Sequence, residues 1–249
     1  MSSKDFAGKI ALVTGGTSGI GKATAFALAR RGARVVISGR DTARGADVVE
    51  TIRKNGGTAD FVPADLRNAE TARELARRTL ATVPQVDILI NNAAVFPFGT
   101  TAETTEETFD NVYNVNVKVP FVLVGELAPK MAQRGSGAIV NVSSMVSEFG
   151  MQGLALYGSS KAALDLLTKA WAGEFGPNGV RVNAVSPGPT RTEGTVGMGE
   201  GIDQLAAMAP ARRAASPDEI AAAIAYLASD EASFVYGTIL AVDGGRNAV

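Results

Sequence analysis

Short apolar runs rich in β-branched residues alternate along this chain with longer segments whose apolar residues recur every three or four positions. The short runs have the character of buried strands, and the longer segments have the periodicity of helices. The predicted strands are 9–14, 34–38, 58–63, 87–91, 139–142, 179–185 and 238–242. The predicted helices are 22–32, 42–54, 69–82, 104–131, 153–176 and 216–229. This alternation predicts an α/β fold with a doubly wound, seven-stranded parallel sheet and helices on both faces.

Three segments add detail to this pattern. The helical segment 104–131 is interrupted near Pro120, where we expect a kink because proline cannot donate a backbone hydrogen bond. Ser216, followed by proline and by Glu219 three residues on, is typical of a helix N-terminus. Residues 193–210 contain glycine and methionine with weak periodicity, which predicts a mobile lid over a ligand site.

The composition excludes several kinds of chemistry. With 249 residues and 46% hydrophobic content the chain is long enough for one large domain. A formal net charge of −1 gives no electrostatic reason to bind nucleic acid or an acidic membrane. No apolar stretch is long enough for a membrane span or signal peptide, so we expect a cytoplasmic protein. The absence of cysteine and histidine argues against thiol enzymes, Ser-His-Asp hydrolases and metal sites.

A glycine-rich turn, Thr14–Gly21, lies between the first predicted strand and the first helix. Glycines let the backbone approach a phosphate, and the helix N-terminus supplies free N–H groups and a partial positive charge. The spacing TGxxxGxG differs from the common dinucleotide pattern GxGxxG. Residues 16–22 also read as a nucleotide triphosphate loop, GxxxxGK, but Ala23 replaces the hydroxyl residue that would hold magnesium. The turn therefore favours a dinucleotide site.

Tyr157 and Lys161 lie four residues apart on one predicted helix face, and Ser144 follows the preceding strand. A tyrosine with its ordinary pKa near 10 is a poor acid or base at neutral pH. A neighbouring lysine cation favours the phenolate, so we expect Lys161 to lower the pKa of Tyr157. Ser144 is placed to hydrogen-bond a substrate oxygen.

These motifs resemble the short-chain dehydrogenase/reductase family, of the roughly 250-residue, 3-oxoacyl reductase-like kind, and the match runs from Gly8 to Gly245. The resemblance implies a single Rossmann-fold domain over 1–249, with a dinucleotide-binding part at about 8–142 and a catalytic and substrate part at about 143–245. It implies a homotetramer. The implied catalytic residues are Asn116, Ser144, Tyr157 and Lys161. The implied cofactor-binding residues are Gly15, Thr17, Ser18, Gly19, Ile20, Gly21, Asp65, Leu66, Asn91, Ala93, Tyr157, Lys161, Pro187, Gly188, Thr190 and Thr192.

The resemblance also implies roles. Tyr157 would exchange the hydroxyl proton, and Lys161 would bind the nicotinamide ribose and lower the tyrosine pKa. Asn116 would hold a helix kink and complete a proton relay, a role compatible with a purely structural kink cap. The sequence departs from the family where Ala94 replaces the usual last glycine of NNAG, which is tolerated only if that backbone is not at positive φ.

NADP(H) is predicted to be favoured over NAD(H). An NAD enzyme of this kind places a carboxylate at the tip of the second strand, where this chain has Gly39. Arg40 follows, and its guanidinium can grip a 2′-phosphate, with the Ser18 hydroxyl close by. Asp41 could instead bind a ribose, but it directly precedes the helix at Thr42, where it is better explained as an N-cap.

The substrate remains open between several apolar carbonyl compounds. Residues 95–98, 145–152 and 193–210 are mostly apolar, which suits lipid-like, cyclic or acyl ketones, a 3-oxoacyl thioester among them, better than sugars. The alternatives are an NAD(H)-dependent alcohol dehydrogenase of the same family, a non-catalytic dinucleotide sensor, and a methyltransferase on a similar sheet.

Overall fold

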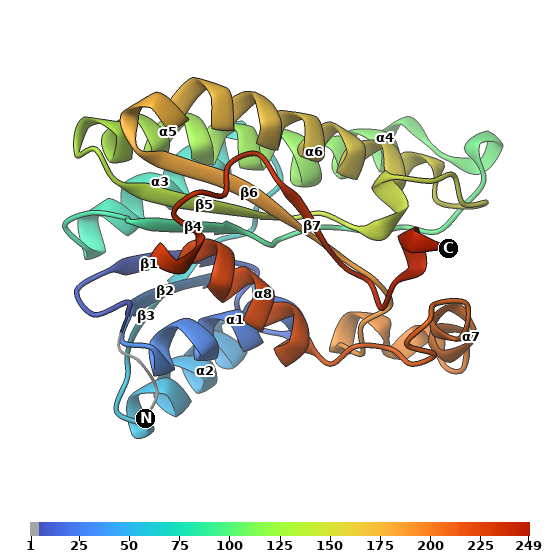
Figure 1. The fold of residues 1–249 in the computed structure, drawn as a ribbon, viewed down its shortest axis with the longest axis horizontal. Helices are drawn as coiled ribbons and strands as arrows, with labels where there is room; N and C mark the ends of the chain where they lie inside the picture. The colour runs from blue at the N-terminus through green and yellow to red at the C-terminus, as the bar shows by residue number, and fades with distance from the viewer. Residues whose placement is uncertain (1–4) are drawn as a thin grey trace.

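One parallel sheet of seven strands runs through the computed structural model, which describes residues 5–249 (Figure 1). The strand order is β3-β2-β1-β4-β5-β6-β7, and each neighbouring pair is parallel. The strands are β1 (Ile10–Thr14), β2 (Arg34–Gly39), β3 (Thr58–Pro63), β4 (Ile88–Asn91), β5 (Gly137–Val142), β6 (Val180–Pro187) and β7 (Ile239–Val242). The predicted fold class is therefore confirmed. The order reverses between β1 and β4, which is where such sheets bind ligands.

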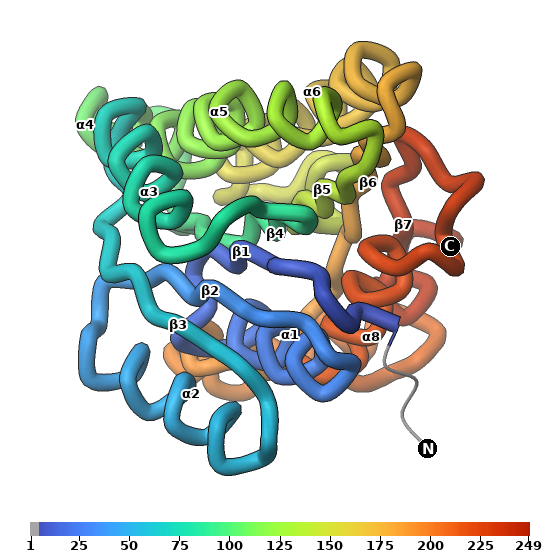
Figure 2. Tube along the Cα trace, turned by 90° about the vertical axis from the view of Figure 1, so that its left-hand side faces the viewer, coloured from blue at the N-terminus to red at the C-terminus, as the bar shows by residue number. Residues whose placement is uncertain are grey.

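Helices cover both faces of the sheet in two layers (Figures 1 and 2). One face carries α1 (Gly19–Arg30), α2 (Thr42–Lys54) and α8 (Pro217–Ala228). The other carries α3 (Ala69–Thr82), α4 (Glu106–Tyr113), α5 (Val119–Gln133) and α6 (Ala155–Phe175). The short helix α7 (Gly201–Ala207) stands beyond the carboxyl ends of the strands.

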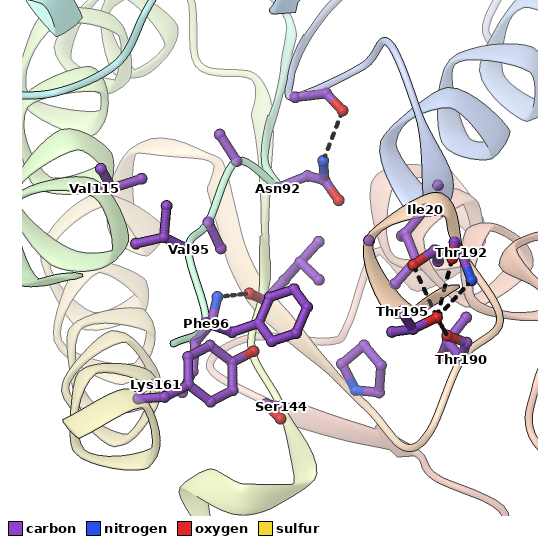
Figure 3. Close-up of a pocket in the computed structure, with 18 of the residues that line it drawn as sticks. Ile20, Asn92, Val95, Phe96, Val115, Ser144, Lys161, Thr190, Thr192 and Thr195 are labelled. Carbon is purple, nitrogen blue, oxygen red and sulfur yellow. Dashed lines mark hydrogen bonds between the residues drawn. The ribbon is translucent and has the colours of Figure 1, made fainter. Parts of the chain in front are cut away.

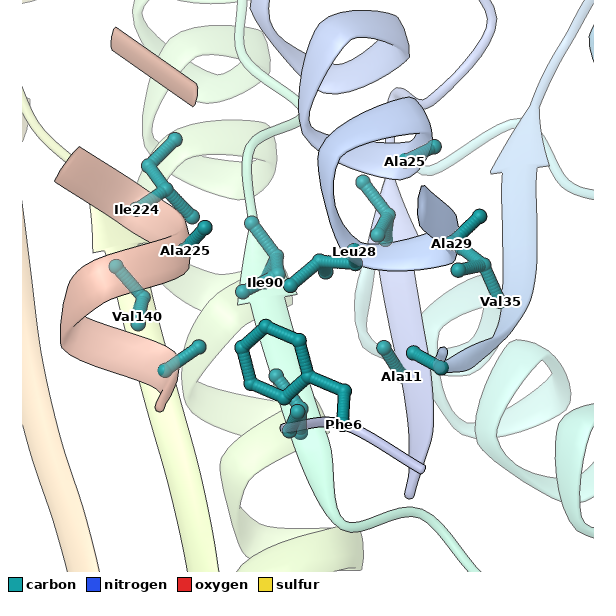
Figure 4. Close-up of a cluster of buried hydrophobic side chains, with 14 of the residues drawn as sticks. Phe6, Ala11, Ala25, Leu28, Ala29, Val35, Ile90, Val140, Ile224 and Ala225 are labelled. Atoms are coloured by element: carbon teal, nitrogen blue, oxygen red, sulfur yellow. The ribbon is translucent and has the colours of Figure 1, made fainter. Parts of the chain in front are cut away.

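A hydrophobic core fills the space under each helical layer. Beneath α1 and α8, Phe6, Leu28 and Ile224 meet the β4 and β5 side chains (Figure 4). Beneath α5, Leu123 and Leu127 pack on the opposite face of the same strands. Because both faces of the central strands are covered, β1, β4 and β5 are almost wholly apolar runs.

The structure refines the sequence prediction at three places. The irregularity expected near Pro120 lies just before that residue, in a π-helical turn at Asn114–Lys118. Pro120 is the second residue of α5, a position that tolerates proline. The predicted lid 193–210 is largely helical, with a 3₁₀ turn at Glu193–Met198 followed by α7. Strand β6 continues through Pro187 rather than ending at residue 185.

Several local predictions are confirmed. The bounds of α2, β3 and α3 match the predicted ranges, and Ser216 and Glu219 form the expected capping box at the start of α8. Ala94 is not at positive φ, since Arg212 is the one non-glycine residue with positive φ among residues 5–249. Across that same range, no helix combines the length and the apolar character needed to cross a membrane.

Candidate active site

A cleft of about 760 Å³ opens at the carboxyl ends of the strands, at the reversal point of the sheet. The glycine turn before α1 forms one end, and the ends of β4, β5 and β6 form the floor. In Figure 3, Lys161, Ser144 and Phe96 lie on one side of this cleft and Thr190 and Thr192 on the other. The fold thus brings the two groups of predicted residues to one place.

The glycine turn needs its glycines for two reasons. Gly15 and Gly19 have φ of +63° and +50°, a region that residues with a Cβ seldom adopt. At Gly21 the limit is space, because an added Cβ would lie 2.3 Å from the Gly15 carbonyl oxygen. The turn is therefore packed tightly enough to present its backbone to a phosphate at the N-terminus of α1. This cradle fits a dinucleotide.

Hydrogen bonds of the Asn92 and Thr14 side chains hold the glycine turn to the loop after β4. The Asn92 side-chain amide donates to the carbonyl oxygens of Thr14 at 2.8 Å and Gly15 at 3.1 Å. The Thr14 hydroxyl accepts hydrogen bonds from the backbone of Asn92 and Ala93. Asn91, the residue chosen from the sequence, does not line the cleft, and its side-chain amide donates to the buried Asn141. The NNAA motif therefore identified the correct loop, but the residue that contacts the glycine turn is Asn92 and not the predicted Asn91.

Arginines gather at the end of the cleft beyond β2. Arg40 and Arg67 both line it and are exposed, and Arg67 is paired with Asp65. Asp41 does not line the cleft, because its carboxylate accepts the Arg44 backbone N–H at 3.0 Å and pairs with the Arg44 side chain. The interpretation of Asp41 as an N-cap is confirmed. A side chain at Gly39 would meet Thr17, so this position has little room for a carboxylate.

Tyr157 and Lys161 project from α6 beside Ser144, as the sequence predicted. Tyr157 is half-buried, and Lys161 is buried, with 2% of its surface exposed. The Lys161 ammonium donates to the Val142 carbonyl oxygen at 2.7 Å and lies 5.8 Å from the centre of the Tyr157 ring. Phe96 packs edge-on to the same ring, with the two centres 6.1 Å apart.

The pKa values in this group correct the sequence argument. Burial raises the pKa of Tyr157 to about 12, and a hydrogen bond from Ser144 acts in the opposite direction. The expectation that Lys161 lowers this pKa is not met, because the ammonium is turned toward Val142. Burial also lowers the pKa of Lys161 to about 8, although the charge of Asp165 opposes that shift. The phenol therefore keeps its proton at neutral pH.

Asn116 lies in the π-helical turn and is buried. Its side chain accepts the Val95 backbone N–H at 2.9 Å and donates to the Val95 carbonyl at 2.9 Å and the Ser160 hydroxyl at 3.0 Å. It does not line the cleft. Asn116 therefore ties the loop after β4 to α6, which matches the structural reading that the sequence left open.

Thr190 and Thr192 lie where β6 passes into the lid, next to Pro187 and Gly188. The Thr190 hydroxyl donates to the Gly188 carbonyl, and the Thr195 hydroxyl donates to the Thr190 carbonyl (Figure 3). These bonds hold the start of the lid against the end of the sheet.

Apolar side chains dominate the part of the cleft beyond Tyr157. The described residues there are Val95, Phe96, Phe98, Asn111, Val115, Met145, Val146, Met151, Leu154, Met198, Ile202 and Leu205. Asn111, at the exposed rim, is the polar side chain of this set, and the set contains no basic residue. The arrangement can hold an apolar molecule with its oxygen at Ser144 and Tyr157.

Most of the predicted site residues line the cleft; Gly21, Asn91 and Asn116 support it from behind. Sequence reasoning missed Asn92, Arg67, Asn111, Val115 and Leu154. Asn92 could have been found from its place in the NNAA motif. The others come from helix faces and loops whose orientation depends on the packing of the whole fold.

Comparisons with known proteins cover nearly the whole chain. A family model described as enoyl-(acyl carrier protein) reductase matches residues 15–247. An uncharacterized oxidoreductase of Thermotoga maritima is 40% identical over 98% of this chain and 100% of its own length. A cis-4-hydroxycyclohexanecarboxylate dehydrogenase of Sinomonas cyclohexanicum is 41% identical over 98% of each chain. A solved structure of a putative NAD(P)-dependent gluconate 5-dehydrogenase of Beutenbergia cavernae, with bound NADP, is 38% identical over 99% of each chain, with a TM-score of 0.94.

Proposed function

Because this chain belongs to the short-chain dehydrogenase/reductase family, we propose that it interconverts a carbonyl compound and a secondary alcohol with NADP(H). The observation that carries the proposal is the meeting of Ser144, Tyr157 and Lys161 in one cleft with a glycine turn at a helix N-terminus. The nicotinamide, when bound, supplies or accepts the hydride.

Tyr157 is the proposed general acid/base. In the reducing direction its phenol donates a proton to the substrate oxygen as that oxygen gains negative charge, and a pKa of about 12 leaves the proton in place until then. An alkoxide is a far stronger base than a phenolate, so the transfer is downhill. Ser144 donates a second hydrogen bond to the same oxygen. The edge-on Phe96 ring helps to keep water from the phenol.

Lys161 is the proposed ribose-binding residue. Its hydrogen bond to the Val142 carbonyl sets the direction of the ammonium at the end of β5. Asn116 acts through position, since its bonds hold the loop bearing Val95 and Phe96 beside α6.

NADP(H) is proposed over NAD(H). Support comes from Arg40 in the lining of the cleft, from the crowding of Gly39 by Thr17, and from the use of Asp41 as a helix cap. Arg40 provides positive charge at this end for a 2′-phosphate, and the carboxylate of Asp65 in the described lining is paired with Arg67.

The proposed substrate is a neutral, apolar ketone or alcohol, with alicyclic compounds preferred. The part of the cleft beyond Tyr157 is apolar and has no basic residue for a carboxylate or phosphate. A relative that is 37% identical is named for cyclopentanol, a neutral alicyclic alcohol.

The test is a titration with NADPH and NADH followed by a panel of carbonyls and alcohols. We expect the dinucleotide to bind and cyclohexanone and related neutral ketones to be turned over. The change in absorbance at the nicotinamide band measures the turnover. The panel includes 4-oxocyclohexanecarboxylate beside its methyl ester, a 3-oxoacyl thioester and an enoyl thioester. Binding without any turnover would favour a dinucleotide sensor, and turnover of the enoyl thioester alone would replace carbonyl reduction with reduction of a carbon–carbon double bond.

A homotetramer is proposed from two exposed apolar surfaces. Phe121 and Leu166, on α5 and α6, are 54% and 70% exposed. Phe234 is 98% exposed, and with Tyr236 it precedes the edge strand β7. Two separate surfaces of this kind suit the two contacts that a tetramer with two-fold axes needs. Light scattering should give four times 25.6 kDa; a mass near one chain would refute the proposal.

A further inference from the structure

The N-terminus of α1 lacks a negative group of its own. Gly19 is its first residue, the Ser18 side chain makes no capping hydrogen bond, and the first turn contains no acidic residue. The helix dipole and the free N–H groups make this end electropositive, and Lys22 adds a charge within the same turn. A carboxylate placed here is therefore stabilised.

Glu193 supplies that carboxylate from the other side of the cleft, 174 residues further along the chain. Its Oε2 atom accepts the Gly19 backbone N–H at 2.8 Å. Backbone N–H groups, its own first and that of Gly19 next, hold the pKa of Glu193 below its ordinary range, and the charges of Lys22 and Arg44 act in the same direction against burial. The contact is thus a bond to an ionised group.

The same contact fastens one internally bonded segment. Thr192 caps the 3₁₀ turn and bonds with Thr195, and Arg191 is paired with Asp203 near the start of α7. The base of this segment is held by backbone bonds between residues 189–191 and Ala215. Residues 190–207, which include most of the predicted lid 193–210 and are called the lid from here on, are therefore bonded to the rest of the chain at Ala215 and at Gly19.

The Glu193 contact lies at the rim of the cleft rather than inside it. Thr192, Gly194 and Thr195 line the cleft, whereas Glu193 is not among the described lining residues. Thr192 also packs closely on Gly19, since a Cβ added there would lie 3.2 Å from its side chain. The lid thus crosses the mouth of the cleft at the glycine turn.

We propose that Glu193 is a latch that holds the lid over the dinucleotide end of the cleft before a dinucleotide binds, where its carboxylate takes the Gly19 N–H that a dinucleotide phosphate would use. It is a positioning residue, since it reaches neither Tyr157 nor the substrate end, and the step it controls is dinucleotide entry, during which the phosphate displaces the carboxylate. This inference rests on the proposed function for the identity of the ligand, but the latch itself is a contact within the chain.

The test compares Glu193→Gln and Glu193→Ala with the control Glu200→Gln, which neutralises an exposed carboxylate on the same lid. Stopped-flow nicotinamide fluorescence measures NADPH and NADH association and dissociation. Because the variants no longer place a carboxylate at this helix N-terminus, we expect the association rate constant to rise roughly three- to thirtyfold while the dissociation rate constant stays within twofold, with the control unchanged. An association rate constant within twofold of wild type for both Glu193 variants would overturn the proposal.

Hydrogen exchange, measured without dinucleotide, separates failure of the latch from failure of the proposed function. Amides of residues 192–205 and of the turn at Gly19 should exchange faster in the Glu193 variants and at the wild-type rate in Glu200→Gln. Unchanged exchange would overturn the latch whatever the ligand. Faster exchange in a protein that binds neither NADPH nor NADH would support the latch and overturn the dinucleotide assignment.

Discussion

The glycine turn and the lid, which meet at the cleft, are held in place by different means. At the glycine turn, buried strands carry the site: Thr14 is 2% exposed, Asn92 bonds two carbonyl oxygens of the turn, and Gly21 has no room for a side chain. At the lid, Val196 is 75% exposed, and the buried apolar cluster there is confined to Ile202, Ala206 and Ala214.

This difference indicates which part of the site can open or change in sequence without disturbing the fold. A site built from buried backbone opens only when the whole domain unfolds. A segment with little buried apolar surface opens locally, at a small cost in free energy. The glycine turn therefore suits a ligand common to many enzymes. The lid and the loop at Phe96 and Phe98 suit the substrate, because changes there leave the sheet undisturbed.

Tyr157 lines the same cleft from α6, and removing its hydroxyl should have the largest effect. Tyr157→Phe is expected to lower turnover by ~10² to 10⁴ while dinucleotide affinity and the free energy of unfolding stay close to wild type. Tyr113→Phe is the control, because it removes a hydroxyl that donates to Ser159 on the surface. Steady-state kinetics with binding titrations measure both; activity of Tyr157→Phe within threefold of wild type would defeat the assignment.

Two glycine substitutions test the contrast directly. In Gly21→Ala the new methyl group would lie 2.3 Å from a carbonyl oxygen, so we expect a loss of ~1–3 kcal/mol in the free energy of unfolding and weaker dinucleotide binding. Gly197→Ala places a methyl group in open space in the 3₁₀ turn of the lid, and its effect should stay within ~0.5 kcal/mol. Urea denaturation compares them. Equal effects would show that the glycine turn and the lid are equally constrained.

The same contrast explains what the sequence could predict. The glycine turn, the cap at Asp41 and the capping box at Ser216 depend on local spacing, and each was found from it. Helix α7 has seven residues, of which Ile202 and Ala206 are buried, which is too short a pattern to recognise. Local rules fail where a partner is distant in the chain.

Contacts between distant residues account for the other misses. The Lys161 ammonium donates to the Val142 carbonyl oxygen. The spacing of Lys161 and Tyr157 in the sequence therefore did not predict which way the ammonium points. Glu193 reaches Gly19 across 174 positions, and no motif marks such a pair. Asn91 and Asn92 are adjacent, and the alternation of side chains at the end of β4 decides which one braces the turn.

Arg40 tests the chemistry of the dinucleotide end. Arg40→Ala should lower the ratio of kcat/KM for NADPH over NADH by roughly tenfold, because an exposed guanidinium gives up a charge-assisted bond to the 2′-phosphate. Arg73→Ala on α3, which removes an exposed arginine outside the cleft, should leave the ratio unchanged. If the wild type uses NADH as well as NADPH, the preference is wrong; if the ratio is the same in Arg40→Ala, its cause lies elsewhere.

The smallest expected effect is a shift in pH dependence at the buried lysine. Burial lowers the pKa of Lys161 to about 8, and the ammonium is the form present below that value. We therefore expect kcat/KM for the dinucleotide, which reports the free enzyme, to fall as the pH rises through about 8. Asp165 raises this pKa by its charge, so Asp165→Asn should move the fall to lower pH, while the exposed Asp110→Asn should not. Profiles of kcat/KM between pH 6 and pH 10 test both expectations. A flat wild-type profile contradicts the role of the Lys161 charge. If the fall occurs at the same pH in Asp165→Asn as in the wild type, the Asp165 carboxylate does not raise the pKa of Lys161.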